Sequence, residues 1–154
     1  MNVEPLETAE GAGFEGCRQL NVFLENRVGQ LLRITRLFER QPIRILGLSV
    51  EGKVDCALLR MLVNDPDAAV ELCGRANLAV SQSEILVVEL PPGKRGIMTI
   101  CAALISSEVN INYAYTVWAT ERNKPCLAIQ VDSLISAVRV LHDRQFCLVA
   151  QHEL

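Results

Sequence analysis

The feature that most constrains the fold of this chain is an internal repeat, in which similar landmarks recur at a nearly constant separation. Four pairs of landmarks define it: Gly29 and Gly96 are 67 residues apart, Ile43 and Val109 are 66 apart, and Val70 and Val138, like Leu78 and Phe146, are 68 apart. A constant period indicates that one structural unit occurs twice. The repeat therefore predicts two similar units of about 70 residues each.

The first half shows the pattern of alternating strands and helices. Apolar residues at every second position from Leu20 to Leu24 predict a strand, and leucines and isoleucines spaced by three and four over 31–38 predict an amphipathic helix that ends before Pro42. Two further strands are expected over 43–50 and 54–63, joined as a hairpin. Asp65 and Pro66 then predict the start of a second helix, and Asn77 its left-handed end.

Residues 78–90 are expected to form two strands, one that closes the first unit and one that opens the second after a break at Ser81-Gln82-Ser83. The second half then repeats the order. Its expected elements are a strand over 85–90, a turn over 91–96, a helix over 97–107, strands over 109–118 and 125–131, a helix capped by Asp132 or Ser133, and a last strand over 146–150.

This order predicts the α+β class, with two tandem ferredoxin-like βαββαβ units whose antiparallel sheets carry helices on one face. We expect the two domains to be residues 16–82 and 83–154, preceded by a flexible arm over 1–15 that contains four glutamates. Cores of this size are marginal alone. The two units should therefore pack together, and a homodimer formed through sheet edges or bare sheet faces would bury further surface.

Composition argues against several classes of function. The net charge is −3 and aromatic residues make up 5% of the chain, so it lacks the basic footprint and stacking aromatics of a nucleic-acid binder. No apolar run approaches the roughly 20 residues that span a membrane. The N-terminus also lacks the basic start and apolar stretch of a signal peptide, so we expect a cytoplasmic protein.

The chemistry-bearing residues form no recognisable catalytic or metal site. The six cysteines are scattered without a C-x-x-C pair and there are two histidines, so we expect reduced thiols, most of them in the core, with no metal and no other cofactor. Ser106-Ser107-Glu108 lacks a placed histidine, His142-Asp143 lacks a nucleophile, and residues 92–96 lack the spacing of a phosphate-binding loop. The chain is therefore not expected to be an enzyme.

The segment from Leu20 to Gly29, followed by a leucine-periodic helix and Ile43-Arg44-Ile45, resembles the opening of an ACT domain, which reads strand, Asn-Lys/Arg-Pro-Gly, helix, Ile-Asn-Ile. The first half is similar to the ACT module of the acetolactate synthase small subunit. The second half carries Val109-Asn110-Ile111-Asn112-Tyr113, and the whole resembles the stand-alone tandem ACT proteins. Because ACT domains are regulatory modules, the resemblance implies an amino acid bound in grooves between paired domains.

A glycine turn that leads into a helix leaves backbone N–H groups free, and the helix dipole favours an anion there, which suits an α-carboxylate. By motif position the candidate ligand-binding residues are Asn26, Arg27, Val28, Gly29, Gln30 and Leu31, then Lys94, Arg95, Gly96, Ile97 and Met98, and on the following strand Asn110 and Asn112. The glycine turns could instead be plain connections, the two asparagines solvent-facing polar residues, and Tyr113 and Tyr115 core or dimer contacts.

The two copies depart from the family pattern in different ways. Val28 replaces the usual proline in the first, Lys94-Arg95 replaces Pro-Gly in the second, and Arg44 stands where the second copy has Asn110. We therefore expect two grooves that are not equivalent. The leading hypothesis is an amino-acid-sensing regulatory protein, and the alternative is a regulatory subunit that docks on an enzyme of amino-acid metabolism through an exposed apolar patch.

Overall fold

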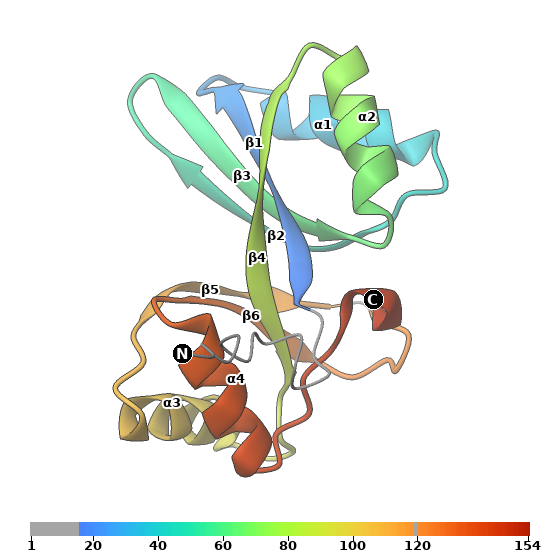
Figure 1. Ribbon diagram of the computed structural model, residues 1–154. Coiled ribbons are helices and arrows are strands. Elements are labelled where there is room, and N and C mark those ends of the chain that lie inside the picture. Colours follow the sequence, from blue (N-terminus) through green and yellow to red (C-terminus); the bar gives the residue numbers. More distant parts are fainter. Residues whose placement is uncertain (1–15, 119) are drawn as a thin grey trace, which may run out of the picture.

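The computed structural model describes residues 16–118 and 120–154, so the predicted N-terminal arm (1–15) lies outside the described residues. In chain order the elements are β1 (Cys17–Glu25), α1 (Gln30–Glu39), β2 (Ile45–Gly52), β3 (Cys56–Val63), α2 (Pro66–Arg75), β4 (Ala79–Glu89), α3 (Gly96–Ser106), β5 (Ile111–Val117), β6 (Cys126–Val131), α4 (Leu134–Asp143) and the short 3₁₀ helix η2 (Gln151–Glu153). Figure 1 shows them as two lobes, with α1 and α2 on one and α3 and α4 on the other. The duplicated α+β architecture is confirmed.

The local signals around α2 act as the sequence predicts. The carboxylate of Asp65 accepts a hydrogen bond from the amide of Ala68 at 3.1 Å, and Pro66 occupies the first turn of the helix. Asn77 adopts a left-handed conformation with φ of 56° just beyond the end of the helix. These residues bound α2 because each satisfies or ends the backbone locally.

The predicted break at Ser81-Gln82-Ser83 is wrong, because β4 runs without interruption through these residues. Its first part pairs with β1, with Ser81 opposite Asn21 and Ser83 opposite Gln19, and its last part pairs with β6 from Leu86 to Glu89. The polar residues 81–83, which are typical of a turn, are instead a polar part of β4 that pairs with polar residues of β1. One strand therefore closes the first unit and opens the second, and Figure 1 shows it passing through both lobes.

The predicted last strand over 146–150 is also wrong as a regular strand. Only Leu148 forms a bridge, with Val88, although the amide of Glu89 donates to the carbonyl of Cys147 at 2.9 Å and the amide of Val149 donates to that of Val87 at 2.8 Å. The segment lies beside β4 but then bends into η2, where the Glu153 carboxylate accepts from the Ala150 amide at 2.8 Å. That local bond ends the pairing after a few residues.

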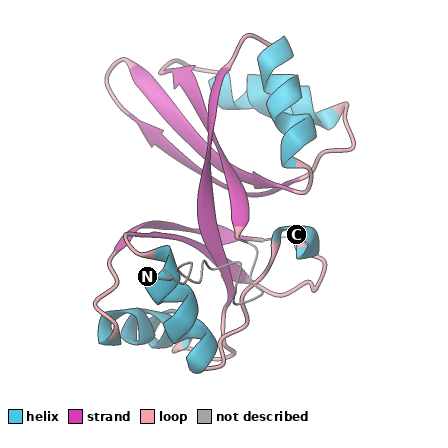
Figure 2. Cartoon of the chain, viewed as in Figure 1, coloured by secondary structure: helices cyan, strands magenta, loops and turns pink. Residues whose placement is uncertain are grey.

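The strands form one closed antiparallel sheet in the order β1-β3-β2-β5-β6-β4. The sheet closes between β2 and β5, where Gly47 lies opposite Val117 and the amide of Trp118 donates to the carbonyl of Leu46 at 2.9 Å. The helices cover the outside of each lobe (Figure 2). Each lobe has its own apolar core, and a third core, which includes Leu46, Leu62 and Val87, fills the space between the units.

Gly47 is expected to be essential for this closure. A Cβ there would lie 2.8 Å from the carbonyl oxygen of Thr116, closer than a Cβ atom approaches such an oxygen, so the backbone would have to shift. We expect Gly47→Ala to lower the free energy of unfolding by about 1–3 kcal/mol through overpacking, as measured by urea denaturation. Gly74→Ala is the matched control, since a Cβ at Gly74 meets nothing within 4 Å and alanine should stabilise the helix slightly. Equal effects of the two changes would contradict the closure.

Candidate ligand-binding site

The first predicted turn connects β1 to α1 and is braced by its own side chains. The amide of Asn26 donates to the backbone carbonyl of Lys53, which ties the turn to the β2–β3 hairpin. The guanidinium of Arg27 pairs with Glu25 at 3.0 Å, whereas the side chain of Val28 is fully exposed. Gly29 takes a left-handed conformation, φ 88°, and forms the N-cap of α1. Few side chains of the turn therefore cover the backbone amides at the start of α1.

The N-terminus of α1 has no anionic partner in the described part of the chain. Gly29 supplies no side-chain cap, and the first turn, which contains Gln30 and Leu31, has no acidic residue. The contrast is α2, which has the Asp65 cap and Asp67 in its first turn. Since the first amides of a helix lack intrahelical acceptors, α1 is open to an external carboxylate.

The second predicted turn differs in detail from the first. Its left-handed glycine is Gly93, φ 96°, and the N-cap of α3 is Arg95, with no side-chain cap and no acid in the first turn. Gly96 is already helical, so the residue equivalent to Gly29 is Arg95 rather than Gly96. A Cβ at Gly96 would lie 2.7 Å from the carbonyl oxygen of Pro91, so the glycine is needed for close packing of the turn.

The other second-half candidates are exposed around this helix start. Lys94 and Arg95 are exposed, and so are the side chains of Ile97 and Met98, each to 55%. The amides near α3 are therefore reached past two cations and two apolar side chains. This combination of cations and apolar side chains suits a ligand that has a carboxylate next to an apolar group.

The two asparagines do not join the second turn. The amide of Asn110 donates to the side-chain oxygen of Asn112 at 3.1 Å, and that of Asn112 donates to Gln130 at 2.6 Å. Both follow the C-terminal end of α3, a helix of 11 residues, which places them about 16 Å from its start. Within one chain, the two asparagines therefore lie apart from the other predicted residues of the second unit, 94–98.

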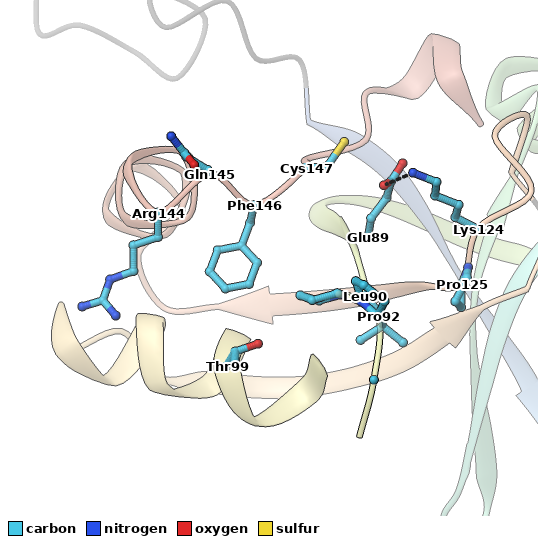
Figure 3. Close-up of a pocket in the computed structure, with 12 residues that line it drawn as sticks. Glu89, Leu90, Pro92, Thr99, Lys124, Pro125, Arg144, Gln145, Phe146 and Cys147 are labelled. Carbon is cyan, nitrogen blue, oxygen red and sulfur yellow. Dashed lines mark hydrogen bonds and ion pairs between the residues drawn. The ribbon is translucent and has the colours of Figure 1, made fainter. Parts of the chain in front are cut away.

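A groove of about 900 Å³ lies beside the second turn (Figure 3). Phe146 and Leu90 lie at its centre, with Glu89 and Lys124 at one end and Arg144 at the other. It is lined by Glu89, Leu90, Pro91, Pro92, Gly93, Thr99, Lys124, Pro125, Arg144, Gln145, Phe146 and Cys147. The sequence patterns missed these side chains because they come from separate segments and carry no local motif.

One end of this groove carries compensated charges. The Glu89 side chain is only 11% exposed and pairs with Lys124 at 3.4 Å and with Arg122 at 3.3 Å. The same guanidinium approaches the Cys147 sulfur at 2.9 Å and pairs with Glu153. Burial raises the pKa of the Cys147 thiol, and the hydrogen bond from the Ala150 amide lowers the pKa of Glu153. This end therefore offers a carboxylate and an ammonium together.

A groove of the first unit lies in a different place and has a different character. A groove of about 650 Å³ runs along α1 and is lined by Gly29 together with Arg33, Arg36 and Arg40. Gly29 is the one predicted residue that reaches it. The first unit thus presents an arginine-rich groove along α1, and the second presents an apolar groove with charged ends.

Within residues 16–118 and 120–154, no three side chains of histidine, cysteine, aspartate or glutamate are grouped so as to hold a metal ion. None of the helices in this described part has the length and apolar character needed to cross a membrane. Its six cysteines are free, and three of them, Cys17, Cys73 and Cys126, are buried. Burial raises the pKa of the Cys17 thiol to about 12, which keeps it protonated.

Solved structures with the same fold support this architecture. A protein from Bacteroides thetaiotaomicron is similar with a TM-score of 0.81 at 24% identity, over 90% of this chain and 94% of that one. The regulatory subunits of aspartate kinase from Thermus thermophilus and Thermus flavus give TM-scores of 0.58 and 0.55, each at 13% identity, over 85% and 84% of this chain and 94% and 92% of theirs.

None of the curated proteins matches the sequence. The family described as ACT domain pair does match, over residues 16–154. That range covers both units and all the described elements. The chain belongs to the ACT domain pair family.

Proposed function

We propose that this protein is an amino-acid-binding regulatory protein that holds its ligand at interfaces between ACT domains and has no catalytic activity of its own. The observation that supports it most is the contrast between helix starts. The helices after the two predicted turns, α1 and α3, begin without a side-chain cap or an acid, whereas Asp65 caps α2. The start of α4 likewise lacks a side-chain cap and an acid in its first turn, and Asp132, which precedes its N-cap, accepts a hydrogen bond from the backbone amide of Asn110 at 3.0 Å; the contrast is therefore with α2.

In this proposal the α-carboxylate of the ligand accepts hydrogen bonds from the amides at a helix start. The first site comprises residues 26–31 and the second residues 94–98. Asn110 and Asn112 lie too far from the second turn of their own unit to complete its site, so a neighbouring domain must supply these or other acceptors for the ammonium group. A cytoplasmic homodimer would provide such neighbours, and binding would then change how the domains pack.

A screen of the twenty amino acids by thermal unfolding tests the proposal. An amino acid present at 100 times its Kd should stabilise the fold by about 2.7 kcal/mol, which corresponds to a rise in Tm of about 5–10 °C for a chain of this size. We expect one amino acid, or a few of related structure, to give such a shift. Flat curves for all twenty at millimolar concentration would argue against an amino-acid sensor.

A specific observation favours the alternative function, that of a subunit docked on an enzyme of amino-acid metabolism. Helix α3 contains no charged residue from Gly96 to Ser106, and the side chains of Ile97, Met98 and Ile105 are 55%, 55% and 73% exposed. An apolar helix face of this kind is typical of an interface. Sedimentation at micromolar concentration separates the two: a dimer favours self-association, and a monomer leaves the face for another protein.

A further inference from the structure

A buried amide lies at the junction between the two units. Gln19 of β1 is fully buried, the one amide or charged side chain that is so in the described part of the chain. The hydroxyl of Tyr115 donates to its Oε1 at 2.7 Å, and its Nε2 donates to the hydroxyl of Tyr113 at 2.8 Å. Both tyrosines belong to β5 in the second unit. Because a buried amide is stable only when its bonds are made, Gln19 joins the units at a defined position.

A groove of about 410 Å³ opens beside this junction and is walled by both units. The first unit contributes side chains from β1 and β3 and the second from β5 and β6, with β4 shared between them. The lining residues are Asn21, Phe23, Leu58, Arg60, Ser81, Ser83, Asn112, Tyr113 and Gln130. We call it the seam groove. It is separate from both helix starts and from the groove of Figure 3.

The seam groove has more hydrogen-bond donors than acceptors. Gln130 accepts a bond from Asn112 through Oε1, and its Nε2 makes no hydrogen bond within the described residues. The Tyr113 oxygen accepts from Gln19 and its own O–H has no acceptor there. The side-chain oxygen of Asn21 accepts a hydrogen bond from Gln19, and its Nδ2 donates to the hydroxyl of Ser83 at 3.1 Å.

The single charged lining residue is Arg60. Its side chain is only 15% exposed; one nitrogen pairs with Glu51 at 3.0 Å, and its guanidinium lies 4.0 Å from the centre of the Tyr113 ring. A guanidinium has five N–H donors in a planar fork, so most remain for a further partner. A groove with one held cation, spare N–H and O–H donors and no lining carboxylate matches an anion that carries acceptors only.

We propose that the seam groove binds a small organic carboxylate, held by Arg60, Gln130 and Tyr113, with Phe23 and Leu58 against its carbon chain. Phe23 is 49% exposed, so its ring is accessible from the groove. Because Arg60 comes from one unit and Gln130 and Tyr113 from the other, the bound carboxylate bridges the units. This site is independent of the amino-acid sites proposed above and uses a ligand without an ammonium group.

Calorimetric titration of the full chain with acetate, succinate and citrate, and with succinamide as the neutral counterpart of succinate, tests the proposal. Gln130→Glu keeps the acceptor for Asn112 but replaces the donor by an anionic oxygen, so it should weaken carboxylate binding about tenfold or more. Gln82→Glu is the matched control. Gln82 is exposed on the neighbouring strand, and its oxygen already accepts from Arg18 at 3.0 Å.

We expect at least one of the three carboxylates to bind the parent chain and Gln82→Glu alike, Gln130→Glu to bind it weakly, and succinamide not to bind. Tyr113→Phe, which removes only the hydroxyl, should weaken binding several-fold and decides the matter if Gln130→Glu does not fold. Gly29→Asp and Arg95→Asp should leave this binding unchanged, which separates it from the amino-acid sites. Absence of binding by all three carboxylates, or equal binding by the Gln130, Tyr113 and Gln82 variants, would overturn the proposal.

Discussion

Replacing the N-cap residue of α1 or of α3 with aspartate should lower the affinity for the regulatory amino acid about a hundredfold at the site that is used. Charge-assisted hydrogen bonds contribute roughly 1.5–3 kcal/mol each, and a carboxylate at the helix start takes the amides that the ligand needs and repels its charge. The variants are Gly29→Asp and Arg95→Asp, because these residues form the two N-caps. Calorimetric titration with the amino acid found in the thermal screen measures the loss.

Asparagine at the same positions is the matched control, since it has the same shape without the charge. It also tolerates the left-handed conformation of Gly29. Gly96→Asp would not serve, because any Cβ there collides with the carbonyl of Pro91. We expect the aspartate variant to lose most of the binding in one unit and the asparagine variant to lose less, because the asparagine side-chain oxygen also accepts from those amides but carries no charge. Normal affinity in both aspartate variants would exclude the two helix starts as ligand sites.

Gln19→Leu should lower the free energy of unfolding by about 2–4 kcal/mol, although leucine is the more hydrophobic residue. The change leaves the Tyr115 hydroxyl, whose acceptor is Gln19 Oε1, without a partner, and a buried polar group left unsatisfied costs about 1–3 kcal/mol. Tyr113, Asn21 and Ser83 also lose the amide that bonds to them. Urea denaturation of the parent chain and the variant measures the difference.

A double-mutant cycle shows whether this cost comes from the bond across the junction. Tyr115→Phe removes the hydroxyl that Gln19→Leu leaves unpaired, so the double variant should be more stable than the sum of the single changes predicts. We expect a coupling of about 1–2 kcal/mol, within the range found for residues in one hydrogen-bond network. Strict additivity would show that Gln19 does not join the units through Tyr115.

Elements whose cause is local could be predicted from the sequence. Asp65 and Pro66 start α2 and Asn77 follows its end because each acts on the backbone within a few residues. The continuity of β4 could not, because Ser81 and Ser83 are ordinary turn residues by type and become strand residues only by pairing with Asn21 and Gln19. The bend after Leu148 could not be predicted either. It leads into η2, and the first unit has no such helix after its second helix, so the repeat gives no sign of it.

The same distinction applies to the sites. The glycine turns could be found in the sequence because the residues of each turn are consecutive and form a short motif. The junction around Gln19 is not, since its two tyrosine partners are 94 and 96 residues away. Gln130 and Arg60, which share the seam groove, belong to different repeats. A contact that exists only between copies leaves no periodic signal within either copy.

The most direct test of the central proposal is to measure whether binding requires the α-carboxylate of the ligand. Calorimetric titration should compare the amino acid that gives the largest thermal shift with its α-carboxamide, which keeps the ammonium group and the side chain. If the helix starts of α1 and α3 receive the carboxylate, the carboxamide should bind about a hundredfold more weakly, because it offers those amides neither charge nor a second strong acceptor. Equal affinities for acid and carboxamide would contradict binding at the helix starts.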